Sequence, residues 1–358
     1  MICCINCFKD VEVRNIIQSL SNIGNCDICH ANQVYIYNTE KDDNLTPLFN
    51  GLLEVYAPLS NLSEHFPREK TRLLKDELYR NWSIFNIDEE NIYRLIREIC
   101  FEKYEETPEL FDGPIAIPAI VDDTYLKEKQ LFGLNDWDKF AKSIKEENRF
   151  HTDVFNTNIL KNYIRSCVVH LKKGELYFRA RRSSNENGFE LCEMGAPPKE
   201  KAGDGRANPK GISYLYLAND IGTAIYEIRA GVLDYISVGT FKLEKNIKLI
   251  DLTSLSEISP FYIEGQTQYA INKEHLRKIG DEIARPINIQ DDPLDYLPTQ
   301  YIVDFIKSLP EKYDGIKYHS TRKEGGYNLA IFDDNLFKCI DVAVYKVTSL
   351  SYRGTFEN

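Results

Sequence analysis

The first half of the chain carries apolar residues at the three- and four-residue spacing of amphipathic helices. Such sets occupy positions 13–20, 74–82, 92–99 and 137–144. Asp10, Asp88 and Asp136 precede three of them and are suited to cap the first helical turn. The pattern therefore predicts a short helix near the N-terminus and a mainly helical region that ends near residue 150.

From about residue 158 the pattern changes to short apolar runs separated by glycine and asparagine, which is typical of β-strands. A helix is expected after Asn219, with Gly231 as its C-terminal stop, and another near Gln300–Leu309. Strands are expected at 175–180, 213–217, 235–243, 248–252, 315–319 and 329–332. This mixture predicts an α+β fold with helices around a largely antiparallel sheet.

Composition and charge restrict the classes of function. Of the 358 residues, 43% are hydrophobic and 28% are charged, as in globular proteins. The net charge of −11 predicts no general attraction to nucleic-acid phosphates or anionic lipid. No apolar run approaches the roughly 20 residues needed to cross a membrane, and Met1–Phe8 lacks the pattern of a secretory signal. We therefore expect a soluble cytoplasmic protein without a membrane or nucleic-acid partner.

The cysteines near the N-terminus form two pairs of identical spacing. Cys4 and Cys7 are three positions apart, as are Cys26 and Cys29. Two such knuckles are typical of a zinc ribbon, in which four thiolates close a tetrahedral structural site around Zn²⁺. Cys3 and His30 are alternative ligands, and a redox-active pair is the alternative function. The isolated cysteines are expected to be buried filler; they are Cys100, Cys167, Cys192 and Cys339.

Four places in the second half combine predicted strand or helix ends with reactive or binding side chains. Arg179 interrupts an apolar strand, and a polar loop, 203–211, runs into Tyr214–Leu217. Glu227 lies beside the apolar face of the helix predicted over Ile221–Ala230, where a carboxylate is expected to be partly sheltered and paired. The fourth place is the segment from Gly315 to Phe332, where a strand ends at Ser320 and the next begins near Asn328.

These pieces resemble the RES domain, a family named for an Arg, a Glu and a Ser. The matching stretches are LYFRAR, GRANPKGISYLYLANDIGTAIYEIR, YLPTQYIVDFIK and YDGIKYHSTRKEGGYNLAIF, which span about residues 170–345. The resemblance implies an ADP-ribosyltransferase-like fold that binds NAD⁺ and breaks its nicotinamide–ribose bond. Members of the family serve as bacterial toxins that deplete NAD⁺, often alongside an antitoxin.

Carried onto this chain, the resemblance implies Arg179, Glu227 and Ser320 as catalytic residues, with Arg206 as the alternative to Arg179 because it also lies in a matching stretch. Glu227 would stabilise oxocarbenium character on the ribose, as carboxylates do in glycosidases. Arg179 would clamp the phosphates of the dinucleotide, and Ser320 would orient the nicotinamide or the ribose. Tyr216 would stack on the nicotinamide, and the further NAD⁺ contacts would come from Arg206, Asn208 and Asn328.

The front of the chain is similar to the HEPN/RES N-terminal region that accompanies some RES proteins, on the strength of CINCF and NCDICH. We therefore expect a zinc ribbon at 1–38, a helical domain at 39–150 and a RES domain at 155–350. Compact family toxins lack this front part. A sensing or docking role, for an antitoxin or sensor protein and in defence against phage, is the hypothesis for it, and a homo-oligomer is a further option.

Three other functions remain open on the sequence. NAD⁺ could donate ADP-ribose to a macromolecule rather than to water or phosphate. The spacing of Arg165 and His170 fits the Arg-x4–6-His motif of HEPN ribonucleases. The chain could also be an adaptor, in which the front half binds a partner and the RES half is inert.

Overall fold

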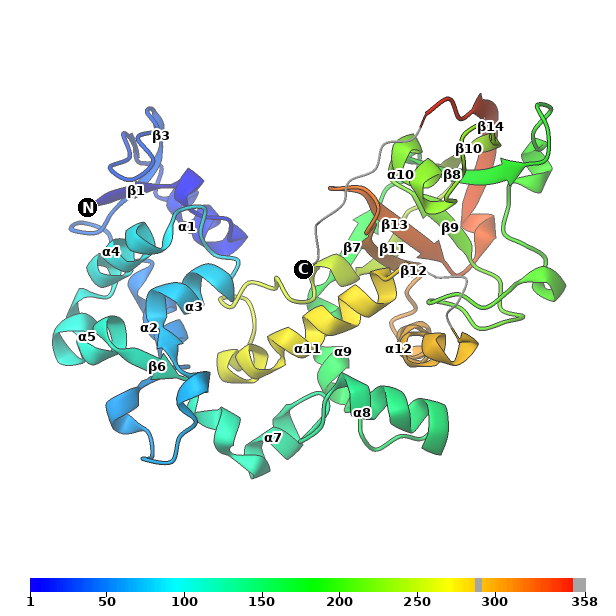
Figure 1. Cartoon of the computed structure of the whole chain (residues 1–358). Helices are drawn as coiled ribbons and strands as arrows, with labels where there is room; N and C mark the ends of the chain where they lie inside the picture. The colour runs from blue at the N-terminus through cyan, green and yellow to red at the C-terminus, as the bar shows by residue number, and fades with distance from the viewer. Residues whose placement is uncertain (287–291, 350–358) are drawn as a thin grey trace. The chain divides into compact units, whose positions relative to one another are not determined.

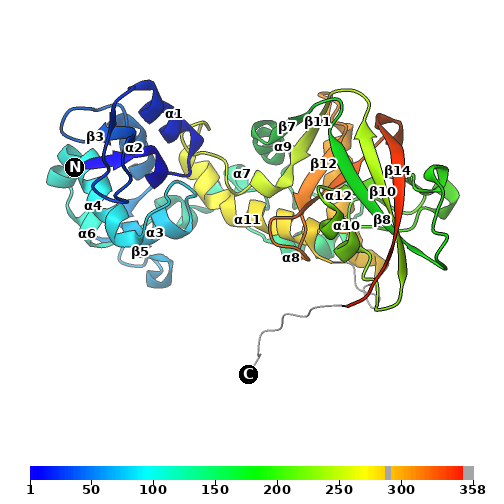
Figure 2. The ribbon, with the colours of Figure 1, turned by 90° about the horizontal axis from the view of Figure 1, so that it is seen from above.

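The structure is a computed structural model that describes residues 1–286 and 292–349 (Figures 1 and 2). The chain forms two compact units. The first comprises Met1–Leu134 and Ser256–Glu274, and the second comprises Asn135–Leu255 with the chain from His275 onward. The three-part division expected from the sequence stays a prediction, and its last residue, 350, lies outside the described residues. None of the described helices is both long and apolar enough to span a bilayer.

The first unit is built from short helices and two small antiparallel sheets. One sheet has the order β1-β3-β2 and the other β4-β6-β5. The strands are β1 (Ile2–Cys4), β2 (Ile23–Gly24), β3 (Val34–Asn38), β4 (Ala57–Pro58), β5 (Arg72–Leu73) and β6 (Pro114–Ala116). The helices are α1 (Val11–Ser19), α2 (Thr46–Leu53), α3 (Leu74–Arg80), α4 (Glu89–Ile99), α5 (Phe101–Glu106), α6 (Glu109–Asp112) and α7 (Asp123–Lys129).

Side-chain caps begin these helices where the sequence predicts them. The Asp10 carboxylate accepts a hydrogen bond from the Val13 backbone N–H, and Asp88 accepts one from Asn91. Each bond satisfies a backbone donor that the first helical turn leaves free. The apolar face expected for α4 is buried, and it consists of Ile92, Leu95, Ile96 and Ile99. The predicted helices of the first unit are therefore confirmed.

The second unit contains an eight-stranded sheet of order β14-β10-β8-β9-β13-β12-β11-β7. Within the described residues every pairing in this sheet is antiparallel except that of β11 with β12. The strands are β7 (Val168–Leu171), β8 (Leu176–Ser183), β9 (Leu215–Ala218), β10 (Tyr235–Leu243), β11 (Ile247–Asp251), β12 (Gly315–His319), β13 (Tyr327–Ile331) and β14 (Phe337–Lys346). The α+β fold with a largely antiparallel sheet is confirmed, although β7 and β14 were not expected.

The second unit also contains the helices α8 (Trp137–Lys142), α9 (Thr157–Ser166), α10 (Ile221–Glu227) and α12 (Leu297–Ser308). Of these, α10 packs against β8, β9 and β10, and α9 packs against β11. The long helix α11 (Gln266–Ala284) begins in the first unit and ends in the second. Asp136 caps α8 as expected, whereas α9 and α11 were not predicted.

The helix α10 is shorter than the predicted Ile221–Ala230. It ends at Glu227 because Arg229 takes a left-handed backbone conformation, with φ of 48°. A residue in that conformation terminates a helix as glycine usually does, so Gly231 is not the stop. The early end leaves Glu227 on the last helical position, next to the sheet that α10 covers.

The two faces of the sheet differ in what they bury. One face carries the larger apolar core, which includes Leu217, Phe241 and Leu329. On the other face a smaller cluster, including Ala180, Ala218 and Ala224, packs α10 against β8, β9 and β10. Small alanine side chains let the helix approach the strands closely. This second face carries the candidate site.

Candidate active site and metal centre

A cavity of about 420 Å³ opens where β8 and β9 separate. The two strands pair at one position, Phe178 with Ala218, and diverge beyond it. Side chains from both strands therefore reach the space between them. The loop 203–208, the end of α10 and residues 283–286 complete the lining. A volume in this range is typical of pockets for small molecules and cofactors.

One cross-strand row forms the part of the cavity nearest α10. Tyr318 on β12 lies opposite Asn328 on β13, and Asn328 lies opposite Ala218 on β9. Residues directly opposite in antiparallel strands have Cβ atoms about 5 Å apart on the same face. Tyr216, two positions before Ala218, therefore lies on this face in the next row. All four side chains line the cavity.

The Glu227 carboxylate is held at this row by two donors. The Ser320 hydroxyl donates to Oε1 at 2.7 Å, and the Asn328 side-chain amide donates to the same oxygen at 2.8 Å. No described residue donates a hydrogen bond to the second oxygen, Oε2. Ser320 and Asn328 are buried, whereas Glu227 is exposed rather than partly sheltered as the sequence predicts. The arrangement fixes the direction of the carboxylate and leaves Oε2 available to a ligand.

Arg179 presents an unsatisfied guanidinium to the cavity. It is largely buried, yet among the described residues it makes no hydrogen bond and no ion pair, and its Nη1 is fully shielded from solvent. Burial, with a smaller contribution from the charge of Arg181, lowers the pKa of Arg179 to about 10. The group stays cationic at neutral pH, so it is a buried positive charge without a counterion. Such a group favours an anionic ligand.

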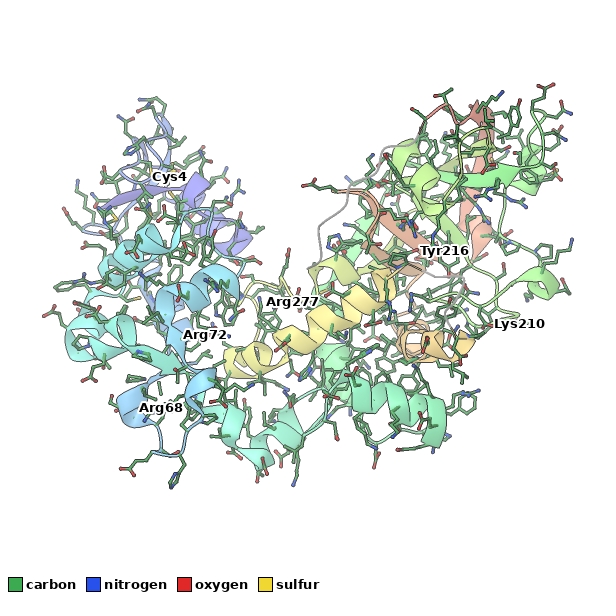
Figure 3. The ribbon with its side chains drawn as sticks, viewed as in Figure 1. Cys4, Arg68, Arg72, Lys210, Tyr216 and Arg277 are labelled. Carbon is green, nitrogen blue, oxygen red and sulfur yellow. The ribbon has the colours of Figure 1, made fainter. Side chains whose placement is uncertain are left out.

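The loop 203–208 is held in place by hydrogen bonds from polar side chains that the sequence analysis expects to contact NAD⁺. Asn208 donates to the carbonyls of Gly203, Pro209 and Ile212, and its Oδ1 accepts a hydrogen bond of 2.5 Å from the Tyr216 hydroxyl. The approach is close enough that a Cβ on Gly205 would lie 2.7 Å from Asn208 Oδ1, so glycine is required there. Lys210, labelled in Figure 3 with Tyr216, closes the loop through its backbone N–H to Asp204.

Arg206, like Asn208, stabilises the loop 203–208 through hydrogen bonds to backbone carbonyls. Its guanidinium donates to the backbone carbonyls of Arg285, at 2.6 Å, and Pro286, and it lies over the ring of Tyr296. These contacts join the loop to the chain that follows α11. Nε and Nη2 of Arg206 and the side-chain amide of Asn208 thus bond within the protein, although both residues line the cavity. Their roles as NAD⁺ contacts stay predictions.

Two tyrosines of the cavity were missed by the sequence reasoning. They are Tyr214, which is fully buried, and Tyr318, which lies two positions before Ser320. The alternation of side chains along a strand puts Tyr318 and Ser320 on the same side of the chain. Because Ser320 was already a candidate catalytic residue, this alternation could have identified Tyr318 as a residue of the same site.

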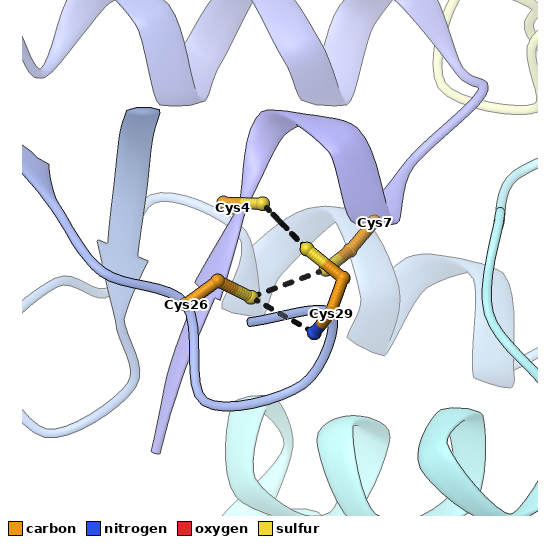
Figure 4. Close-up of side chains that lie close together, drawn as sticks. All are labelled: Cys4, Cys7, Cys26 and Cys29. Carbon is orange, nitrogen blue, oxygen red and sulfur yellow. Dashed lines mark hydrogen bonds between the residues drawn. The ribbon is translucent and has the colours of Figure 1, made fainter. Parts of the chain in front are cut away.

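The four knuckle cysteines come together in the first unit (Figure 4). Their sulfur atoms all lie within 4.8 Å of one another. The separations are 3.9 Å for Cys4 and Cys7, 3.4 Å for Cys4 and Cys29, and 3.5 Å for Cys7 and Cys26. A tetrahedral site with Zn–S bonds of about 2.3 Å requires sulfur atoms about 3.8 Å apart. The four residues could therefore hold a metal ion such as zinc.

The surroundings of the cluster also suit thiolate ligands. The backbone N–H groups of Ile28 and Cys29 both point at the Cys26 sulfur, at 3.4 Å each, as donors around a metal-bound thiolate do. Burial raises the pKa of Cys4 to about 12, so a cation is needed to keep it deprotonated. Cys3 is buried outside the cluster. Among the isolated cysteines, Cys192 is exposed and so does not fill the core as expected.

Comparison with known proteins places the cavity within one family. Residues 178–353 match the family model described as the RES domain, whose members are generally NAD-related toxin enzymes. The match includes the strands, loop and helix end that line the cavity. No curated protein and no solved structure matches the chain. The match begins at residue 178, so the resemblance of the first unit to the HEPN/RES N-terminal region stays a prediction.

Proposed function

We propose, from the premise that residues 178–353 are a RES domain, that this protein binds NAD⁺ in the cavity and cleaves its nicotinamide–ribose bond. The acceptor would be water or inorganic phosphate. The family is generally one of NAD-related toxin enzymes, which supports an enzyme of that class. A bacterial toxin or an anti-phage effector is the corresponding biological role.

Arg179 carries the proposal. A buried guanidinium without a partner is costly in an empty protein, since the charge has lost its water without gaining a counterion. The pyrophosphate of a dinucleotide supplies two anionic groups that match the fork of arginine donors. In the proposed complex Arg179 therefore binds the phosphates, and the substrate satisfies a group that the protein leaves unsatisfied.

Glu227 would act on the bond that breaks. Nicotinamide leaves NAD⁺ as a neutral molecule, so the transition state needs stabilisation of positive charge on the ribose rather than an acid. The carboxylate is oriented by Ser320 and Asn328 through Oε1. Oε2 would then face the ribose, where it stabilises the oxocarbenium character or accepts a hydrogen bond from a hydroxyl. Ser320 in this arrangement is a positioning residue that acts through Glu227.

The first unit is proposed to hold one Zn²⁺ through Cys4, Cys7, Cys26 and Cys29. The ion would be structural, because four thiolates leave no open coordination position. Docking of an antitoxin or a sensor protein is the role we propose for this unit.

The ribonuclease alternative has less support. Arg165 lies on α9 and bonds Glu311 at 2.8 Å, so its guanidinium is engaged in an ion pair. His170 lies on β7, at the edge of the sheet, and neither residue lines the cavity.

The test is NAD⁺ consumption by the purified, zinc-loaded chain, with and without phosphate, and with products separated by chromatography. Wild type should release nicotinamide, and Glu227→Gln should abolish the release. Glu244→Gln, an exposed carboxylate on the β10–β11 turn, is the matched control and should retain activity. Free ADP-ribose would identify water as the acceptor, and ADP-ribose 1″-phosphate would identify phosphate. ADP-ribose attached to a macromolecule would contradict the proposal in favour of a transferase.

A further inference from the structure

The polar groups of the cavity divide into those that bond within the protein and those that do not. Asn208, Tyr216 and Asn328 are bonded to other side chains or to backbone carbonyls. Lining groups with unused capacity, within the described residues, include the Arg179 guanidinium, the Tyr214 hydroxyl, the Tyr318 hydroxyl and Oε2 of Glu227. Polar groups that line a cavity are normally satisfied, so groups of this kind mark where a ligand can bond.

We infer that Tyr318 contacts the substrate and binds the nicotinamide–ribose half of NAD⁺ through its hydroxyl. This inference rests on the proposed function, and it assigns a contact to a residue for which neither the sequence nor the family match provides a role. The hydroxyl can donate one hydrogen bond and accept others. The ribose hydroxyls and the nicotinamide carboxamide are the groups in that half with matching capacity.

The position of Tyr318 in the sheet indicates that it contacts the nicotinamide–ribose half of NAD⁺. Tyr318 lies directly opposite Asn328, and the Asn328 amide holds the carboxylate of Glu227. The phenol ring is therefore beside the carboxylate at which the bond is proposed to break. Tyr214, another residue with an unbonded hydroxyl, lies just before β9 and precedes Ala218 of the same row by four positions, or about 13 Å of extended chain. The Tyr214 hydroxyl is thus the less suitable of the two for the reacting half.

The surroundings of Tyr318 hold its hydroxyl in the protonated form. Burial, together with the nearby Tyr216 and the charge of Glu227, raises the pKa of Tyr318 well above its ordinary value. A neutral phenol beside a carboxylate is a hydrogen-bond donor around neutral pH. Its removal should therefore weaken binding without a pH dependence of its own.

The test measures binding to the full-length, zinc-loaded chain by calorimetry with a non-cleavable carbocyclic analogue of NAD⁺, and separately with ADP. Tyr318→Phe removes a single oxygen atom that bonds no described residue, so its unfolding midpoint should match that of wild type. Tyr313→Phe is the matched control. Tyr313 is a buried tyrosine five positions earlier whose hydroxyl also bonds no described residue, and it does not line the cavity.

Tyr318→Phe is expected to weaken the analogue roughly three- to tenfold and to leave ADP unchanged, the size of one lost hydrogen bond. Tyr313→Phe should bind both ligands as wild type does. Equal affinity of Tyr318→Phe and wild type for the analogue would overturn the inference, as would an equal loss for ADP. Wild type that binds neither ligand would instead remove the proposed function, and the inference with it.

Discussion

The Ser320 hydroxyl donates a 2.7 Å hydrogen bond to the carboxylate of Glu227, a residue 93 positions earlier in the chain. Glu227 ends α10, and Ser320 follows β12, so the bond joins two elements that the sheet brings together. Asn328 on β13 completes the arrangement from a third element. The orientation of this carboxylate therefore depends on correct pairing of β12 and β13.

Replacement of Ser320 by alanine should lower the turnover of NAD⁺ while leaving the protein folded. The carboxylate would keep the Asn328 bond but lose one of its two constraints, so we expect a tenfold to hundredfold fall in kcat, or about 1.4–2.7 kcal/mol. Initial rates of nicotinamide release measure the effect. Ser308→Ala, which removes an exposed hydroxyl bonded to the Phe305 carbonyl, is the control and should keep the wild-type rate. An unchanged kcat in Ser320→Ala would mean that Asn328 alone positions Glu227.

Replacement of Arg179 by methionine should stabilise the empty protein and abolish ligand binding. The change removes an unpaired buried charge and retains much of the side-chain volume, so the free energy of unfolding should rise by about 1–3 kcal/mol. Urea unfolding measures this term, and calorimetry with ADP measures binding. Arg181→Met is the comparison, because that arginine bonds the Glu193 carbonyl and stacks on Phe189. If Arg179→Met were the less stable protein, the guanidinium would have a structural role that its contacts do not explain.

The four-cysteine cluster should bind one metal ion per chain. Cys26→Ser should reduce the zinc content measured by elemental analysis to a small fraction of that of wild type, because Cys26 supplies a ligand and organises the knuckle through two backbone N–H groups. Structural zinc sites contribute on the order of 10 kcal/mol to the folding of small units, so the first unit should also lose cooperative unfolding. Cys192→Ser, at an exposed cysteine outside the cluster, should leave the zinc content unchanged. Equal zinc in both variants would place the metal elsewhere.

An ion pair near the start of α10 should give a small, pH-dependent contribution to stability. Burial acts to raise the pKa of Asp220, but the bonds from Lys323 and Thr223 outweigh it and lower the pKa to about 2. Because the folded-state pKa is depressed, the stabilisation is complete well above the ordinary value of 3.8 and is lost as the pH falls towards 2. Both side chains are about a third exposed, so solvent screening limits the effect to less than ~1 kcal/mol.

Lys323→Met tests this contribution through urea unfolding at several pH values. The variant should be slightly less stable than wild type between pH 5 and pH 8, and the difference should shrink as the pH approaches 2. Lys338→Met, at an exposed lysine on β14, should show no such difference. A gap between Lys323→Met and wild type that stays constant down to pH 2 would contradict the assigned ion pair.

Local patterns predicted the helices whose ends carry their own signals. Asp10, Asp88 and Asp136 cap helices as expected, because a capping side chain bonds the backbone only three positions later. The helix α11 escaped notice because its buried face includes Asn272 and Lys273. Asn272 bonds the Lys129 carbonyl and the Leu131 N–H, both far away in the chain. Polar residues satisfied by distant partners break the apolar periodicity on which the prediction depends.

The sequence by itself determined the helices that carry their own caps, the paired cysteines and the RES family of residues 178–353, because these depend on spacing along the chain. The CxxC knuckles need only a tight turn to bring two sulfur atoms together, so their spacing is itself the signal. Only the tertiary structure decided that Oε1 of Glu227 is bonded while the Arg179 guanidinium is not, and that the Asn208 amide and Nε of Arg206 bond within the protein. Hydrogen-bond partners so distant in sequence are chosen by strand register and helix length, and neither is encoded by local spacing.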